Sequence, residues 1–345
     1  MGVDIGDLVE PKTISLSSLS NKTLAIDSFN VIYQFLASIR QPDGTSLMDF
    51  KGNITSHLSG LFYRTARLLE NGIRPVYVFD GKAPKFKQGT QEKRAKTKKD
   101  AEEKWKKALE EERYDDAKKY AQATSRLTQE MIEEAKELLN YMGVPVIQAK
   151  SEGEAQSAVM VQKGLAHAAA SQDYDSLLFG APILVRNLSI SGKRKVPKKD
   201  KYILIEPEEL NLSTSLKSIG ITRDQLILIG ILSGTDFNKG VTRVGAKTAL
   251  KIVKEYPTFK KIEKYVKEKY NYEFEENIEE IIDFFINPPY LEVKKINFNP
   301  MKSSAIIKLL CKDHDFSEDR VTRTIENIEK MKKEVWGQSK LDKWF

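Results

Sequence analysis

The sequence has few of the residues that build disulfides and soft-metal sites. Cys311 is the only cysteine among 345 residues, so the chain can form neither an internal disulfide nor a zinc site made of thiolates. The three histidines, His57, His167 and His314, are scattered, and we expect no imidazole cluster from them. Any metal must therefore be held by oxygen ligands, which favours Mg²⁺ or Mn²⁺.

Long hydrophobic runs are also missing. The longest purely apolar runs, such as Leu226–Ile229, are far too short to cross a bilayer. No apolar signal region follows Met1, and the start Met1-Gly2 departs from a myristoylation signal because Gly6 stands where Ser or Thr is required. These absences predict a soluble intracellular protein with no membrane partner.

The charge balance is only slightly basic. Lys and Arg outnumber Asp and Glu by 56 to 49, and the net charge is +7, so the distribution of charge matters more than its excess. Nucleic acid is the leading specific partner for such a chain. The length allows one large α/β domain or two smaller ones.

Short β-rich runs alternate with helical segments. Apolar periodicity predicts helices over 56–71, which ends at Asn71-Gly72, and over 128–142, which Gly143 follows. The alternation predicts an α/β fold whose mostly parallel central sheet is flanked by helices. The predicted strands are 23–27, 75–80, 144–148, 168–173, 183–186 and 202–205.

One basic stretch interrupts this alternation. Residues 82–99 hold eight basic residues and one acid, Glu92, and the charged helical sequence that follows reaches about Arg126. A solvated helix is one interpretation. Because the stretch directly follows a strand that ends in Asp80, an insertion that projects over a site is the other. After Gly245 the chain is helical to about Trp336.

Acidic residues follow the predicted strands. Asp27 ends the first strand, Asp80 ends the second, and Asp173 and Asp175 follow the fourth. Ligand sites in open parallel sheets lie at the carboxyl ends of the strands, so these acids should converge. In an extended segment residues i and i+2 point the same way, so we expect Asp173 and Asp175 to share a target.

Three further carboxylates join this set. Glu152 and Glu154 flank Gly153 where a helix begins, and an extended entry would turn both inward; Asp236 is the seventh candidate. A helix cap or a surface pair is the more common role for any single acid. Seven carboxylates in one cleft would repel each other unless cations lay among them. The set predicts two Mg²⁺ ions, roughly 3.5–4 Å apart, with Mn²⁺ as a substitute.

Four sequence blocks carry a family resemblance. Together with the start Met1–Asp4 and the C-terminal residues, they are most similar to the archaeal-type flap endonucleases among the structure-specific 5′-nucleases, in order over nearly the whole chain. The resemblance implies a PIN-like fold with a helical arch and a helix–two-turn–helix motif. The blocks are Phe79-Asp-Gly-Lys82, Ser151-Glu-Gly-Glu-Ala155, Gln172-Asp-Tyr-Asp175 and Gly234-Thr-Asp236.

The resemblance also implies an activity. It implies a two-metal phosphodiester hydrolase that cuts 5′ flaps from branched DNA, with 5′–3′ exonuclease activity, in DNA replication and repair. Lys87 and Arg94 match arch-base cations that approach the scissile phosphate, and with Asp80 and Asp173 they form the expected catalytic set. The acids that match metal ligands are Asp27, Asp80, Glu152, Glu154, Asp173, Asp175 and Asp236.

Other positions match DNA contacts of that family. Tyr33 matches a base-stacking tyrosine, although a half-buried helix aromatic is an equal alternative. Residues 240–249 open a helix as a phosphate cradle, with a plain helix cap as the alternative. Arg243 replaces the first glycine of the family's Gly-x-Gly turn there, which puts its monovalent-cation site in doubt. The expected DNA-binding residues are Gly2, Tyr33, Arg40, Arg64, Glu152, Gly234, Asp236 and Lys247.

The last residues resemble the box that docks replication and repair proteins on the sliding DNA clamp. One helical turn would place Gln338, Leu341 and Trp344 on one side with Phe345 beside them, and the alternative is a tail folded back on its own core.

The expected parts of the chain are a nuclease domain over 1–98 and 116–257, an arch over 82–127, a helix–two-turn–helix near 236–256, a helical part over 258–336 and a clamp-binding tail over 337–345.

Rival functions remain open at this point. A related 5′ exonuclease or a junction resolvase would share the acids, as would an RNA-processing nuclease. A non-catalytic protein that bridges DNA and clamp would not need them. We expect a monomer, located in the cytoplasm of an archaeal-type cell or in the nucleus of a eukaryotic one.

Overall fold

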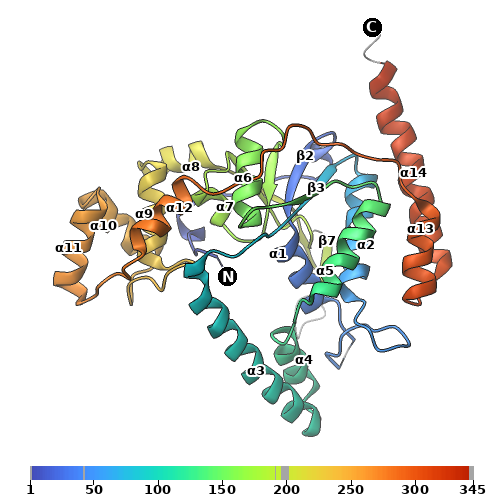
Figure 1. Cartoon of the computed structure of the whole chain (residues 1–345), viewed down its shortest axis with the longest axis horizontal. Helices are drawn as coiled ribbons and strands as arrows, with labels where there is room; N and C mark the ends of the chain where they lie inside the picture. The colour runs from blue at the N-terminus through green and yellow to red at the C-terminus, as the bar shows by residue number, and fades with distance from the viewer. Residues whose placement is uncertain (1, 42, 191, 196–201, 342–345) are drawn as a thin grey trace.

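The central feature is a seven-stranded, mostly parallel sheet. The computed structural model describes residues 2–41, 43–190, 192–195 and 202–341. The sheet has the order β1-β9-β6-β5-β2-β3-β4, and the five strands from β6 to β4 run parallel (Figure 1). Its strands are β1 (Lys12–Thr13), β2 (Thr23–Asp27), β3 (Arg74–Phe79), β4 (Val146–Gln148), β5 (Ala168–Ala170), β6 (Ile183–Arg186) and β9 (Glu208–Asn211).

The predicted α/β architecture is confirmed, with two differences at the edges. β9 pairs antiparallel with both β6 and β1, and neither β1 nor β9 was predicted. The run 202–205 was predicted as one of the core strands, and this was wrong. It forms β8 (Tyr202–Ile205), which pairs only with β7 (Gly192–Lys195) in a separate two-stranded sheet among the described residues.

Alternation along the strands divides the core into two layers. Ala25 faces one hydrophobic cluster, whereas its neighbours Leu24 and Ile26 face the other. In the same way Val78 lies in the first cluster and Phe79 in the second. Successive strand residues point to opposite faces, so a strand that is apolar on both sides must be covered by helices on both sides.

Helices supply these covers. The face of Ala25 is packed by α6 (Gly153–Gln162), α7 (Asp175–Leu178), α9 (Arg223–Ser233) and α12 (Ile278–Ile286). The opposite face is packed by α1 (Ser28–Ser38), α2 (Ser56–Glu70), α5 (Gln129–Tyr141), α13 (Ser303–Ile307) and α14 (Glu318–Leu341). The predicted helices over 56–71 and 128–142 correspond to α2 and α5.

The basic insertion forms a pair of helices. α3 (Gln88–Glu110) and α4 (Tyr114–Gln122) pack on each other through small buried residues such as Ala108 and Ala117. Figure 1 shows the pair projecting together from the body of the molecule. We call residues 82–127 the arch.

The segment after α9 makes the helix–two-turn–helix. α10 (Ala246–Glu255) follows a turn in which Gly240 has φ +69° and Arg243 has φ +68°. Arg243 therefore adopts the left-handed conformation that usually falls to glycine. α8 (Leu212–Ile219) precedes α9, and α11 (Phe259–Tyr270) follows α10.

An extended segment, residues 287–302, crosses from α12 to α13 (Figure 1). The buried side chain of Gln156 holds it: its Nε2 donates to the carbonyl of Leu291 at 3.0 Å, and its Oε1 accepts from the amide of Leu291 at 2.7 Å. Gly143 has φ +73°, and a Cβ there would lie 2.1 Å from the carbonyl oxygen of Asn299. The close approach explains why glycine ends this turn.

A buried polar cluster lies between α2, α5 and the C-terminal part. The Nε2 of His57 lies 3.0 Å from Glu134, and the two ring nitrogens of His314 lie 3.4 Å from Glu134 and 3.0 Å from Asp49. Two histidines that lie 257 residues apart in the sequence thus share one carboxylate.

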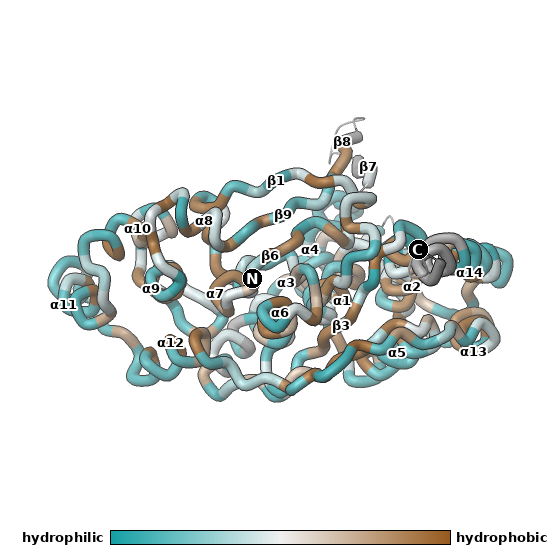
Figure 2. Tube along the Cα trace, turned by 90° about the horizontal axis from the view of Figure 1, so that it is seen from above, coloured by the Kyte–Doolittle hydropathy of each residue, from teal (hydrophilic) through white to brown (hydrophobic). Residues whose placement is uncertain are grey.

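Hydrophilic positions gather at the two ends of the molecule, in α11 and α14 (Figure 2). None of the helices in the described part of the chain combines the length and the apolar character of a membrane span.

Candidate active site

A cleft of about 940 Å³ lies between the carboxyl ends of the central strands and the arch. The order of the strands reverses at this point: β3 and β4 lie on one side of β2, and the chain then returns to place β5 on the other side. Ligand sites in open sheets are expected where the strand order reverses. Six of the seven predicted acids line it: Asp27, Asp80, Glu152, Glu154, Asp173 and Asp236. Their predicted convergence is therefore seen in the structure.

Backbone amides fix the first two acids. Asp27 ends β2 and caps α1, with its Oδ1 accepting from the amide of Asn30 at 3.2 Å. Asp80 follows β3, and its Oδ1 accepts from the amide of Gly153 at 2.7 Å. A Cβ on residue 153 would lie 2.8 Å from that oxygen, so glycine allows the close approach.

The next two acids begin α6. Glu152 is the N-cap residue with extended backbone (φ −78°, ψ 133°), and Glu154 lies in the first turn. The predicted extended entry is thus present, and it lets both carboxylates line the cleft. Glu154 accepts a hydrogen bond from the hydroxyl of Ser171 at 2.9 Å.

Asp175 does not follow the predicted geometry. β5 ends at Ala170, Tyr174 has helical backbone angles, and Asp175 is the first residue of α7, so the predicted extended segment was wrong, although the charge of Asp173 still acts on the Asp175 carboxylate. The carboxylate of Asp175 is buried beside the N-terminal segment instead, where it accepts from the amide of Val3 at 2.7 Å. A Cβ on Gly2 would lie 2.6 Å from it.

The carboxylates raise each other's pKa. Burial, reinforced by the charges of Asp80 and Asp173, raises the pKa of Asp27 well above its usual value. Burial and the charges of Asp175 and Asp27 do the same to Glu154, and burial raises the pKa of Asp175 to about 7. Carboxylates that oppose each other's ionisation in this way fit a site for hard divalent cations, because such ions prefer oxygen ligands and offset the repulsion.

Two cations from the arch lie on the other acids. The Nζ of Lys87 is 2.5 Å from Glu152, and Arg94 binds both carboxylate oxygens of Asp236. Burial opposes the charge of Lys87, but Glu152 and Asp80 outweigh it and raise the pKa of the lysine. In the described part of the chain no three potential ligands lie close enough together to enclose one ion as they stand.

Tyr33 lines the same cleft from α1. Its side chain is 38% exposed, and the Nζ of Lys98 lies 4.8 Å from the ring centroid. The tyrosine thus lines the cleft with part of its surface exposed, which is compatible with stacking on a base.

Two more predicted DNA contacts, Glu152 and Asp236, also line the cleft, whereas Arg40, Arg64, Gly234 and Lys247 lie outside it. Arg40 donates to the carbonyls of Leu36 and Gly44 at 2.9 Å, and to the hydroxyl of Ser125 at 3.0 Å, so it braces the end of α1. Arg64 lines a smaller pocket beside β2. Lys247 forms an exposed pair with Asp7 at 2.9 Å, and Gly234 ends α9 with φ +94°.

The structure describes the predicted clamp-binding residues only in part. Gln338 and Leu341 belong to α14, but their side chains are not described, and Trp344 and Phe345 lie outside the described residues.

Sequence reasoning missed the residues that hold the acids. Asn30 and Ser171 each donate to a carboxylate of the cleft, at 3.1 Å to Asp173 and at 2.9 Å to Glu154. A signal for Asn30 was present, because it stands three residues after Asp27, the position whose amide a capping side chain bonds.

Comparisons with known proteins identify the family of the chain. Residues 5–101 match the XPG N-terminal domain model, and residues 143–236 match the XPG I-region model. The chain is 49% identical to flap endonuclease 1 of Pyrococcus furiosus, over 100% of this chain and 99% of that protein.

Solved structures show the same fold. Flap endonuclease-1 from Methanococcus jannaschii superposes with a TM-score of 0.74 at 39% identity, covering 96% of this chain and 98% of that one. The catalytic core of Rad2 in complex with DNA substrate superposes with a TM-score of 0.69 at 22% identity, covering 94% and 97%, and at that identity it shows the fold alone.

The fold and the acidic cleft thus define a nuclease. More narrowly, the chain belongs to the flap endonuclease 1 family of XPG-type nucleases.

Proposed function

We propose that this protein is a structure-specific endonuclease that removes 5′ flaps from branched DNA by two-metal hydrolysis, and that it also acts as a 5′–3′ exonuclease. The observation that carries the proposal is the cleft in which six buried or half-buried carboxylates face the cations of the arch. The substrate class follows the name of the relatives that match over the whole chain.

Two Mg²⁺ ions, or Mn²⁺ in their place, are the proposed cofactors. The residues that would hold them are Asp27, Asp80, Glu152, Glu154, Asp173, Asp175 and Asp236. When bound, divalent ions supply Lewis acidity and activate a water for attack on phosphorus. The products are a 3′ hydroxyl and a 5′ phosphate.

The side chains of the arch bind and orient the substrate in this mechanism. Lys87 and Arg94 would exchange their carboxylate partners for the scissile phosphate and stabilise the charge that develops on its oxygens. Tyr33 would stack on a base at the junction and hold the phosphate in line.

A cleavage assay on a 5′-flap substrate, with and without a chelator, tests the chemistry. Asp80→Ala and Asp173→Ala should each reduce the rate by about 10²-fold or more while DNA binding is largely kept, since each removes a predicted metal ligand. Unchanged Mg²⁺-dependent turnover in both variants would refute the site, and cleavage insensitive to the chelator would refute the metal mechanism.

Substrate choice needs its own comparison. Rates on a flap, a nicked duplex and a four-way junction separate flap cutting from a 5′ exonuclease and from a junction resolvase. Flap arms made of ribose rather than deoxyribose test the RNA-processing alternative. The flap of DNA should be cut fastest, and a junction cut faster than the flap would contradict the proposal.

We also propose that residues 337–345 dock the protein on the sliding DNA clamp. The support is the sequence pattern of Gln338, Leu341, Trp344 and Phe345. Deletion of 337–345 should spare cleavage of a flap without clamp and remove the stimulation by added clamp. Equal stimulation of the truncated protein would show that the tail has another role.

A further inference from the structure

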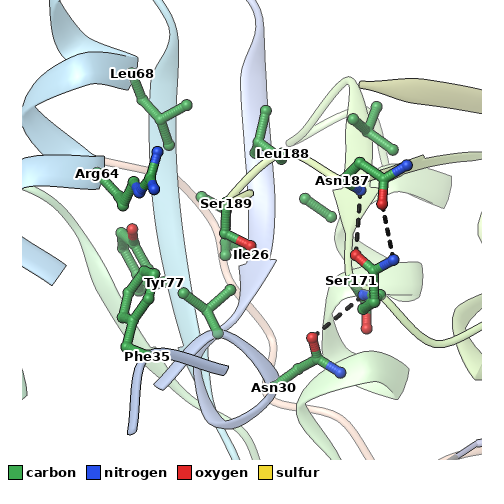
Figure 3. A pocket seen from close by; sticks show the side chains of 14 residues that line it. Ile26, Asn30, Phe35, Arg64, Leu68, Tyr77, Ser171, Asn187, Leu188 and Ser189 are labelled. Atoms are coloured by element: carbon green, nitrogen blue, oxygen red, sulfur yellow. Dashed lines mark hydrogen bonds between the residues drawn. The ribbon is translucent and has the colours of Figure 1, made fainter. Parts of the chain in front are cut away.

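Asn30 lies between two cavities of the molecule. It is the third residue of α1 and lines both the acidic cleft and the smaller pocket beside β2. Figure 3 shows the smaller pocket, with the side chain of Asn30 directed toward the loop at Ser171. Its backbone amide contacts Asp27, the first metal-ligand candidate, and its side-chain amide contacts the loop that carries Asp173.

The amide of Asn30 makes a matched pair of contacts. Its Nδ2 donates to Oδ2 of Asp173 at 3.1 Å, and its Oδ1 accepts from the backbone amide of Gln172 at 3.3 Å. The reverse orientation would set oxygen against carboxylate and NH₂ against N–H, so the two partners fix which end is which. The backbone amide of the same residue caps Asp27 at 3.2 Å.

Gln172, whose backbone amide donates to Asn30, is itself held by other hydrogen bonds. The side chain of Gln172 donates to Oδ1 of Asn187 at 2.8 Å and accepts from the amide of Asn187 at 3.3 Å (Figure 3). The carbonyl of Gln172 accepts from Nε of Arg186 at 3.1 Å. Asn187 is in the left-handed region, with φ +59°, which turns its backbone toward Gln172. Asn30 is therefore bonded to a loop that three further hydrogen bonds hold in place at Gln172.

We propose that Asn30 is a positioning residue that orients the carboxylate of Asp173 for divalent metal binding. A hydrogen bond to one carboxylate oxygen restricts rotation of the group, so it fixes the direction in which the carboxylate faces the cleft. Groups of this kind, which bond the ligands rather than the metal, commonly change metal affinity or activity by about 10–100-fold when removed. The inference rests on the proposed two-metal function.

Asn30→Leu is the main test, because leucine is close to asparagine in size and cannot donate. Mn²⁺ binding, followed by electron paramagnetic resonance of the free ion, should weaken by about tenfold or more. In flap cleavage the divalent concentration for half-maximal rate should rise, with kcat restored at high Mn²⁺ and KM for DNA unchanged. Asn30→Asp should show a larger loss, since it sets a carboxylate against Asp173.

A second variant acts at a distance from the cleft. Asn187→Gly keeps the left-handed backbone and removes the Asn187 side chain from Gln172, so it should shift Mn²⁺ affinity in the same direction by a smaller factor. This variant keeps the test decisive if Asn30→Leu does not fold. Asn140→Leu, an exposed substitution of the same kind on α5, serves as the control and should change neither affinity nor rate.

The outcomes separate the inference from the proposed function. Wild-type protein that binds no Mn²⁺ would refute the metal mechanism itself. Wild-type protein that binds Mn²⁺, with Asn30→Leu binding equally well, would overturn the positioning role alone. A lower melting temperature with an unchanged Mn²⁺ midpoint would show that Asn30 is only structural, and would also overturn it.

Discussion

Arg94 of the arch donates two hydrogen bonds to Asp236, with its Nη2 at 2.7 and 2.6 Å from the two carboxylate oxygens. Lys87 pairs with Glu152 in the same cleft. Both cations thus rest on residues that we propose as metal ligands. Metal ions would take the carboxylates of these pairs, and a DNA phosphate would take the cations. Binding of either one frees the groups that the other needs, so substrate and metal should assist each other's binding.

Lys87→Ala should lower kcat on a 5′ flap by about 10²–10³-fold, because it removes a positive charge aimed at the scissile phosphate. DNA affinity should change little, since one contact among many is lost. Lys104→Ala, an exposed lysine farther along α3, is the matched control for charge and should cleave normally. Single-turnover rates measure the effect, and an equal loss in both variants would assign it to general arch charge.

Arg94→Lys should retain only part of the activity, with a loss on the order of tenfold. Lysine keeps the charge but cannot match the planar guanidinium that spans two oxygens. Arg94→Ala should lose more. The three proteins should be compared by kcat at saturating Mg²⁺, and a lysine variant as fast as wild type would show that charge alone is needed.

Gly2→Ala should reduce cleavage and weaken Mn²⁺ binding by about 10–100-fold. The added Cβ would lie 2.6 Å from the carboxylate of Asp175, so that carboxylate must move from the place where Val3 holds it. Asp4→Ala, an exposed change two residues later, should have no such effect. Normal Mn²⁺ affinity in Gly2→Ala would contradict this account.

Tyr33→Ala should weaken transition-state binding by about 1–3 kcal/mol, the usual worth of a base stacked on an aromatic ring. Tyr33→Phe should stay close to wild type, because stacking uses the ring, which lies beside Lys98 in the cleft, and the substitution keeps the ring. The ratio kcat/KM on flap DNA measures both. Equal losses in the two variants would point to the hydroxyl instead.

Asp49→Asn should destabilise the protein in a pH-dependent manner. Burial opposes ionisation of Asp49, but hydrogen bonds from Asn53, His314 and Lys51 outweigh it and lower its pKa to about 2. A lowered pKa means that the stabilisation is complete above the ordinary value of 3.8 and is lost as the pH falls through about 2.

Urea unfolding of wild type and Asp49→Asn at several pH values checks this dependence. The difference in unfolding free energy should shrink as the solution becomes more acidic than about pH 4. Glu263→Gln, on the exposed side of α11, is the control and should differ little from wild type at any pH. A gap that widens in acid would contradict the assignment to Asp49.

Features that depend on a short, local pattern of apolar and acidic residues could be predicted from the sequence. Buried strands with acids at their ends predicted both the parallel sheet and the meeting of Asp27, Asp80 and Asp173, because parallel strands bring their carboxyl ends to one edge. The family resemblance, rather than any periodicity, singled out Lys87 and Arg94 among many arch cations.

Features that depend on long-range packing were not predictable. β1 has only two residues and β9 reads Glu-Glu-Leu-Asn, so neither carries an apolar pattern, and β9 adds to the edge of the sheet at β6. The turn at Tyr174 ends the extended segment before Asp175, where α7 begins and the amide of Val3 binds the Asp175 carboxylate. The meeting of His57 and His314 on Glu134 likewise requires the C-terminal helices to return to α2.

That return has a mechanical consequence. The extended segment 287–302 carries the chain away from the helix–two-turn–helix, and α14 then packs against α2 in the nuclease core. A load applied at the carboxyl end is therefore borne by the layer that also carries α1 and its capping aspartate. A tether at that end would thus hold the layer to which Asp27 belongs, whereas the helix–two-turn–helix lies at the other end of the extended segment.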